Sequence, residues 1–277
     1  MSKKKIYFHA DDFGRSIEVS KNIMKCLIKG NLNSVSIMVN HQNNKYHNKL
    51  KKLKKVNKRL HLNLTDFSNK DFKNNSLPNN LNFIKLIFLS DQEKKKIYRE
   101  IELQIRKYKK IYKPKILKID GHEHVHMIPW ILRYLQKIKN KQNIKEFRNS
   151  NESLMVPRFS DLFSFRYYRN IAACILVKFL YYFQGSPKII APKFSGIIYS
   201  GIQSEETINN TLNFFKKNNY KYCEILIHPG YASLKESSKF HKNYFNFYNS
   251  KNRKKEFNLC FSREINNELK SFNLNYD

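Results

Sequence analysis

Three histidines alternate within one short, acid-flanked stretch of this chain. Residues 120–129 read DGHEHVHMIP, which places a carboxylate at Asp120 and a glycine directly before the first imidazole. Imidazole and carboxylate groups this close together in sequence are typical of metal-binding sites. The stretch therefore predicts a metal site, built from some or all of His122, His124 and His126.

A second acid-rich turn, Asp11-Asp12, follows a short apolar stretch near the N-terminus. A hydrolytic metal needs a few nitrogen or oxygen ligands and open positions for water and substrate, often two histidines and one carboxylate. Asp12, His61 and His122 can supply that set. Asp11 is then free to accept a proton from water, because adjacent residues in a strand or turn point in different directions. The pattern indicates metal-assisted hydrolysis.

Spacing alone leaves other assignments open. In an extended chain His122, His124 and His126 would share one face, so an all-histidine zinc site competes with the mixed set. The Asp11-Asp12 pair by itself also fits an ordinary turn with a helix cap, and a lone His61 fits a satisfied core or surface histidine. The sequence His228-Pro229-Gly230 also fits a simple strand-ending turn.

The elements that must position these residues are short apolar runs alternating with helical patterns. Capping signals support the helices, with Ser16 and Gly30 bounding one and a capping box at Ser90 opening another. A final helix is expected across residues 257–269. Repeated strand-then-helix units predict a mostly parallel sheet covered by helices, either a barrel or an open doubly wound sheet.

The barrel is favoured because the candidate residues follow the ends of different strands, and a barrel brings those ends to one face. We therefore expect an α/β, single-domain (β/α) barrel-like fold of about seven to eight mostly parallel strands, with the metal site at their carboxyl ends. The domain should span residues 1–277, with residues 151–203 as an irregular insertion or lid-like region.

The formal charge of +31 comes from 53 Lys and Arg against 22 Asp and Glu, spread along the whole chain. We interpret most of it as a solvated surface, and we find no nucleic-acid recognition motif. The aromatic, basic stretch around Arg166, Arg169 and Lys178 leaves peripheral membrane contact open. A homodimer also stays open. The scattered cysteines, the lack of a signal-peptide core and the lack of a membrane-spanning segment favour a cytoplasmic protein.

Four motifs resemble the YdjC/ChbG family of carbohydrate deacetylases in order and rough spacing. They are HADDFG at 9–14, LHLNLT at 60–65, DGHEHVHMIP at 120–129 and HPG at 228–230. The first and third are specific to the family, and the resemblance spans nearly the whole chain. It implies a (β/α)-barrel-like fold and hydrolysis of the N-acetyl group of amino sugars with one divalent ion, Mg²⁺ or Zn²⁺.

The resemblance also implies roles for individual residues. Asp12, His61 and His122 match the metal ligands and Asp11 matches the general base. His228 is expected near the substrate as acid or oxyanion stabiliser, whereas Arg148, His124 and His126 are expected in substrate contact. The chain departs from the family pattern at His9, Arg59 and Glu123, where Asn, Gly, and Gln or His are usual.

Two other functions use the same residues. A metal-dependent phosphoesterase is one, because the same ligands can bind phosphate oxygens. A basic binding protein with a structural metal is the other. An open coordination position separates an enzyme from such a binder, because structural sites are closed.

Overall fold

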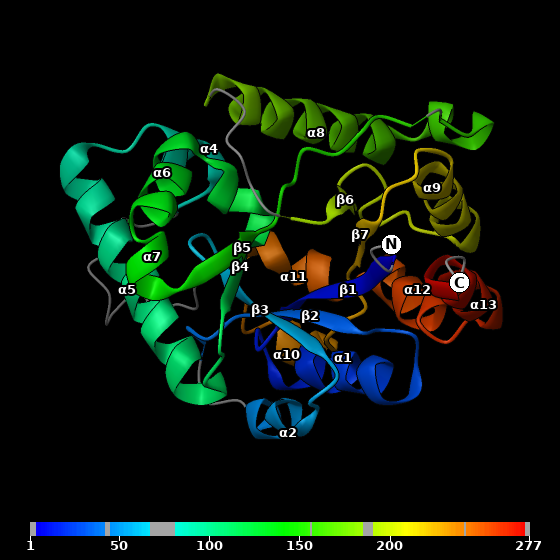
Figure 1. Ribbon diagram of the computed structural model, residues 1–277, viewed down its shortest axis with the longest axis horizontal. Coiled ribbons are helices and arrows are strands. Elements are labelled where there is room, and N and C mark those ends of the chain that lie inside the picture. Colours follow the sequence, from blue (N-terminus) through cyan, green and yellow to red (C-terminus); the bar gives the residue numbers. More distant parts are fainter. Residues whose placement is uncertain are drawn as a thin grey trace.

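Seven parallel strands form one curled sheet (Figure 1). The computed structural model describes residues 4–41, 45–66, 81–155, 157–184, 191–240 and 242–274. The strand order is β5-β4-β3-β2-β1-β7-β6. The strands are β1 (Lys5–Phe13), β2 (Ser34–Ile37), β3 (Asn57–Leu62), β4 (Leu117–Gly121), β5 (Ile144–Phe147), β6 (Lys193–Ser195) and β7 (Tyr222–Ile227).

The predicted parallel α/β fold is confirmed, in the form of a half-barrel. Every described strand pair is parallel, and no ladder among the described residues joins the edge strands β5 and β6. In β1 every residue after Lys5 is buried. Strands that are buried along their whole length are typical of a parallel sheet that is covered by helices.

Helices surround the sheet and reach their expected positions through local capping (Figure 1). Ser16 accepts a hydrogen bond from the backbone N–H of Val19, and Ser90 forms the predicted capping box with Glu93. The helices are α1 (Ile17–Lys29), α2 (Tyr46–Lys52), α4 (Phe83–Ile87), α5 (Asp91–Tyr112), α6 (Pro129–Lys137), α7 (Lys139–Gln142), α8 (Phe165–Phe183), α9 (Glu205–Lys217), α10 (Leu234–Ser237), α11 (Lys242–Tyr248), α12 (Lys251–Leu259) and α13 (Arg263–Leu274), with the 3-10 helices η1 (His122–Met127) and η2 (Phe159–Phe163).

The single helix predicted across residues 257–269 is wrong. The chain breaks between α12 and α13, and the Ser262 hydroxyl caps the new helix by accepting from the backbone N–H of Ile265 at 3.2 Å. A four-residue apolar spacing continues across such a break, since both helices pack on the same core. Periodicity alone therefore cannot detect it.

Residues 151–203 are more regular than predicted in the part that the structure describes. They contain η2, the 19-residue α8 and the edge strand β6, which pairs with β7. Val156 and residues 185–190 lie outside the described residues. A role as a lid stays a prediction. In the described chain no helix has the length and apolarity to cross a membrane.

Candidate metal and catalytic site

The end of β1 has an irregular backbone that sets the direction of its two aspartates. The register with β2 shifts between Ala10 and Phe13, and Asp12 has a φ of 70°. A non-glycine residue in the left-handed region is uncommon, and such irregularities often re-aim a side chain beside a functional site. Asp11 and Asp12 thus both reach the carboxyl edge of the sheet and are both buried.

The histidine stretch after β4 is not extended. Glu123 and His124 have φ values of 50° and 59° within η1, so the chain turns sharply after His122. The extended conformation, in which three alternating histidines would share a face, is therefore not the one adopted. The Nδ1 atom of His124 hydrogen-bonds Ser150 Oγ at 2.9 Å. His126 donates from Nε2 to the backbone carbonyl of Arg148, also at 2.9 Å.

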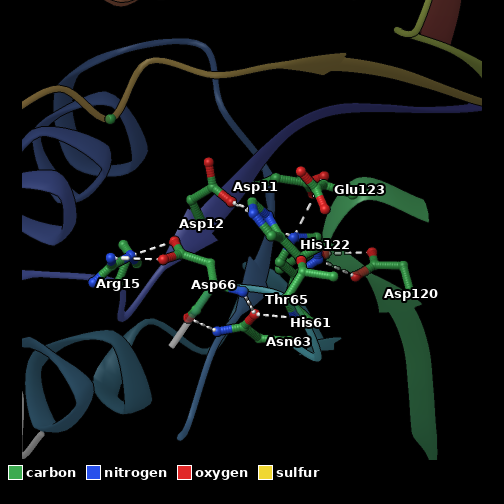
Figure 2. A network of polar contacts seen from close by, with 12 residues as sticks. Asp11, Asp12, Arg15, His61, Asn63, Thr65, Asp66, Asp120, His122 and Glu123 are labelled. Carbon is green, nitrogen blue, oxygen red and sulfur yellow. Dashed lines mark hydrogen bonds and ion pairs between the residues drawn. The ribbon is translucent and has the colours of Figure 1, made fainter. Parts of the chain in front are cut away.

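Asp12, His61 and His122 converge from β1, β3 and the turn after β4 (Figure 2). The Oδ1 atom of Asp12 lies 3.1 Å from Nδ1 of His122 and 3.6 Å from Nε2 of His61. One ligand atom from each residue lies within 4.8 Å of the others, and all three side chains are buried. These are the three residues that the sequence selected as mixed ligands, and they can hold a metal ion.

His61 is oriented as metal-binding histidines usually are. Its Nδ1–H donates to Oδ1 of Asp120 at 2.7 Å, which directs Nε2 toward Asp12. The Nε2 atoms of His61 and His122 are buried and have no hydrogen-bond partner among the described residues. A carboxylate behind the imidazole fixes its tautomer and raises its basicity as a ligand. Buried polar atoms are rarely left unpaired, so these nitrogens suit a metal ion.

The protonation of the two histidines depends on nearby carboxylates. Burial alone would lower the pKa of His61, but the surrounding carboxylates, Asp11 foremost, raise it to about 10. The pKa of His122 is also raised, since hydrogen bonding and charge from Asp12 outweigh its burial. An incoming cation must therefore replace a proton at this cluster.

The second carboxylate oxygen of Asp12 is bound by Arg253. The Nη2 atom of Arg253 donates to Oδ2 of Asp12 at 2.8 Å, and its guanidinium lies 3.8 Å from the ring centre of Phe247. Arg253 is buried on α12, although its place in a basic run suggested a solvated surface residue. The interaction leaves Oδ1 of Asp12 directed toward the two histidines.

Asp11 lies beside this cluster without being one of its members. Both of its oxygens accept hydrogen bonds of 2.8 Å from Arg148, and Oδ1 lies 3.1 Å from Nε2 of His9. Burial alone would raise the pKa of Asp11, but the charges of Arg148 and His61 together with hydrogen bonds from His9 and Arg148 hold the pKa well below its usual range. Its Oδ2 lies 3.9 Å from Nε2 of His61, so Asp11 is ionised and adjacent to the proposed metal position.

A second buried group, His9, Asp11 and Asp120, also has the composition of a metal site. Arg148 lies within it, since its Nη2 contacts Oδ1 of Asp11 at 2.8 Å and Oδ2 of Asp120 at 3.0 Å. One guanidinium nitrogen thus bridges both carboxylates of this group and supplies the positive charge that a cation would bring between them. We therefore assign this second group to the support of Asp11 and His61.

A cavity of about 670 Å³ opens over the cluster and gives a substrate access to it. Asp11, His61, His122, His124 and His228 all contribute to its wall. His228 is placed there by Glu256, which accepts from its backbone N–H. Burial, followed by the charge of Arg253, lowers the pKa of His228 to about 4. The imidazole of His228 is therefore neutral near pH 7.

Two residues predicted to contact substrate have other partners. Arg148 is fully buried, and its donors are taken by Asp11, Asp120 and Glu224. We therefore assign it to positioning Asp11 rather than to sugar contact. His126 is also fully buried against the backbone, whereas His124 does border the cavity.

Sequence reasoning missed the supporting roles of Asp120, His9 and Arg253. The signal for Asp120 was present, because a carboxylate two residues before a ligand histidine and at a strand end can reach the neighbouring strand. No local signal identified Arg253, which is 241 residues from its partner Asp12.

The sequence profile of the family described as YdjC-like protein matches residues 5–271. The chain belongs to the YdjC-like family. The match runs from the start of β1 into α13, so every candidate residue lies within it.

A solved structure shares the fold of this chain. It is a protein from Enterococcus faecalis that is provisionally named a cellobiose-phosphate cleavage protein, and it superposes with a TM-score of 0.64 at 18% identity. The similarity covers 98% of this chain and 96% of the other, and at this identity it establishes the shared fold alone. No curated protein matches the chain.

Proposed function

We propose that this protein is a metal-dependent hydrolase that removes the N-acetyl group from an acetylated amino sugar. The observation that carries the proposal is the convergence of two buried histidines on Oδ1 of Asp12, which lies 3.6 Å from Nε2 of His61 and 3.1 Å from Nδ1 of His122. Each histidine has a buried Nε2 without a partner among the described residues, and the ionised Asp11 lies beside them. Membership of the YdjC-like family supports a carbohydrate substrate, as does the sugar phosphate in the name of the similar Enterococcus faecalis protein.

The donor set selects the class of metal. Two imidazoles and one carboxylate suit zinc or another borderline divalent metal better than Mg²⁺, which prefers oxygen ligands. When bound, such an ion supplies Lewis acidity that polarises the amide carbonyl and lowers the pKa of water. Three protein ligands leave coordination positions open for water and substrate.

Asp11 is proposed as the general base. A base must lie within reach of the proton that it accepts, and its 3.9 Å separation from His61 places it next to the ligand cluster. Its low pKa makes it a weak base in isolation. Such a base would suffice for a water whose pKa a bound ion had lowered, and Arg148 keeps the Asp11 carboxylate from rotating.

His228 is proposed as the group that stabilises the developing oxyanion. Its neutral imidazole can donate a hydrogen bond but holds no extra proton to release near pH 7. In the balanced reaction, water adds to the acetyl carbonyl carbon, the C–N bond breaks, and acetate and the free amine leave. The proton accepted by Asp11 goes to the departing nitrogen.

Released acetate measured across a panel of acetylated sugars tests this proposal. The panel holds N-acetylglucosamine oligomers, nucleotide sugars and lipid-linked sugars, each assayed with Zn²⁺, with Mg²⁺ and after chelation. We expect acetate from at least one sugar, lost on chelation and restored by Zn²⁺. Phosphate release from a phosphorylated sugar without any acetate would instead establish a phosphoesterase.

A further inference from the structure

The outer face of α8 is unusually apolar for a surface helix. Six aromatic or aliphatic side chains on it, which we call the outer stripe, are at least half exposed, and Phe165, Phe179 and Phe183 are 85%, 61% and 71% exposed. Figure 1 shows α8 along the upper periphery of the molecule. An exposed patch of this kind marks an interaction surface. The outer stripe comprises Phe165, Tyr168, Ile175, Phe179, Tyr182 and Phe183.

Exposed aromatic side chains also occur directly before the helix. In η2, directly before α8, Phe159 and Phe163 are each 78% exposed. The helix is nevertheless held firmly, because the amide of Asn170 donates to the backbone carbonyls of Ile198 and Ser200, both at 3.0 Å. The exposed aromatic groups are thus presented on an anchored element.

The charge around the outer stripe has one sign. Residues 157–184 contain four basic residues and a single acidic residue, Asp161, which is buried and bound to Arg158. The helix α8 itself carries Arg166, Arg169 and Lys178 and no carboxylate. Arg166 and Arg169 also border the cavity, and Arg158 is paired with Asp161 and Glu206, so two copies packed through this face would repel mainly through Lys178 and the formal charge of +31 on each copy. An anionic surface instead complements the positive charge of this face.

The same helix forms one wall of the cavity over the candidate site. Arg169, Ala173 and Leu176 of α8 border the cavity, and Ile84 of α4, which is 63% exposed, contributes to its wall as well. A molecule held by the outer stripe would therefore lie next to the opening of the site. Apolar side chains at that rim suit an acyl or prenyl chain better than a free sugar.

We propose that α8 docks the protein on an anionic lipid surface, so that its substrate is an acetylated amino sugar attached to a lipid. A helix with aromatic residues on one face and Lys or Arg beside them lies in the plane of a membrane interface in this way. The outer stripe enters the interface while the cations contact lipid phosphates. The substrate class rests on the deacetylase function proposed above, whereas the docking does not.

Vesicle flotation tests the docking without any turnover. Wild-type protein is mixed with vesicles of equal parts phosphatidylcholine and phosphatidylglycerol, or of phosphatidylcholine alone. We expect binding to the anionic vesicles, weakened by salt, and little binding to the neutral ones. The triple variant Phe165→Ser, Phe179→Ser, Phe183→Ser should bind at least about tenfold more weakly, since it loses three aromatic groups that enter the bilayer when the wild type docks. A matched control, Ile28→Ser, Leu103→Ser, Ile116→Ser, removes exposed apolar groups from other elements and should bind like wild type.

Acetate release separates this proposal from the proposed function. The triple variant should keep wild-type activity on a soluble acetylated sugar and lose it on a lipid-linked sugar in vesicles. Equal loss on both substrates, or unchanged vesicle binding by the triple variant, would overturn the docking. A wild-type dimer in sedimentation that the triple variant turns into monomers, without vesicle binding, would assign the outer stripe to a second copy. Docking with no acetate from any sugar would leave the lipid surface standing and remove the deacetylase.

Discussion

Arg148 binds both carboxylate oxygens of Asp11, each at a distance of 2.8 Å. A two-point contact of this kind fixes the plane of a carboxylate as well as its position. The guanidinium is held in turn by Glu224, which accepts from Nε at 2.7 Å. Asp11 therefore presents one orientation toward His61, and the pair acts as a unit.

Arg148→Lys should lower kcat by roughly 10 to 100-fold and leave KM and metal content close to wild type. Lysine keeps the positive charge but cannot span both oxygens of Asp11. Steady-state kinetics with metal analysis measures this split. Arg169→Lys, at a residue of the cavity wall, serves as the control and should act mainly on KM. A large rise in KM for Arg148→Lys would restore the sugar contact predicted from the sequence.

Asp11→Asn should retain the metal while turnover falls by roughly 10² to 10⁴-fold, which is typical for loss of a general base. The amide has the size of the carboxylate but does not accept the proton of water. Turnover and bound metal are measured on the same sample. Turnover near the wild-type rate in a fully metal-loaded variant would exclude Asp11 as the base.

His122→Ala should abolish stoichiometric metal binding together with activity, because it removes one of three ligands. His124→Ala is the matched control, since its Nδ1 is bound to Ser150 outside the cluster. The His124→Ala substitution should lower metal affinity or activity less, by roughly 10 to 100-fold at most. Titration of each metal-free variant with Zn²⁺ compares them. Equal loss of metal from both variants would favour the all-histidine site.

Zn²⁺ affinity should increase as the pH rises from about 6 toward 10. In the metal-free protein the pKa of His61 is raised to about 10, so its imidazole holds a proton over this range. Binding at Nε2 must release that proton, which tightens binding by up to about tenfold per pH unit for each proton released. Calorimetry in two buffers of different ionisation enthalpy counts the protons. Binding that is independent of pH and releases no proton would contradict the assignment.

Binding of random DNA should be weak and should be lost steeply as salt increases. The charge of +31 is spread along the chain, and exposed charges are screened within about 8 Å at physiological ionic strength. Fluorescence anisotropy of labelled random DNA over one salt series measures this affinity. Tight binding that survives moderate salt, with no acetate released from any amino sugar, would replace the enzyme by a basic binding protein.

The sequence alone was enough to single out Asp12, His61 and His122 as candidate ligands, because each of them lies at or near the end of a strand-like run. Asp12 and His122 directly follow apolar runs, and polar residues at the carboxyl ends of parallel strands meet at one edge whatever the loops between them do. Helix starts at Ser16 and Ser90 were equally predictable, since a cap involves residues only three positions apart. These features depend on neighbours in the chain and on the handedness of strand-helix units.

Only the tertiary structure decided which long-range partners support the cluster. Arg253 reaches Asp12 across 241 residues because α12 packs against the carboxyl end of the sheet, and residue type alone does not distinguish a buried arginine from a solvated one. The divergence of His124 from His122 depends on positive φ values at two non-glycine residues, which the surrounding packing imposes. The half-barrel likewise stays open because nothing described pairs β5 with β6, and strand closure is a property of the whole sheet.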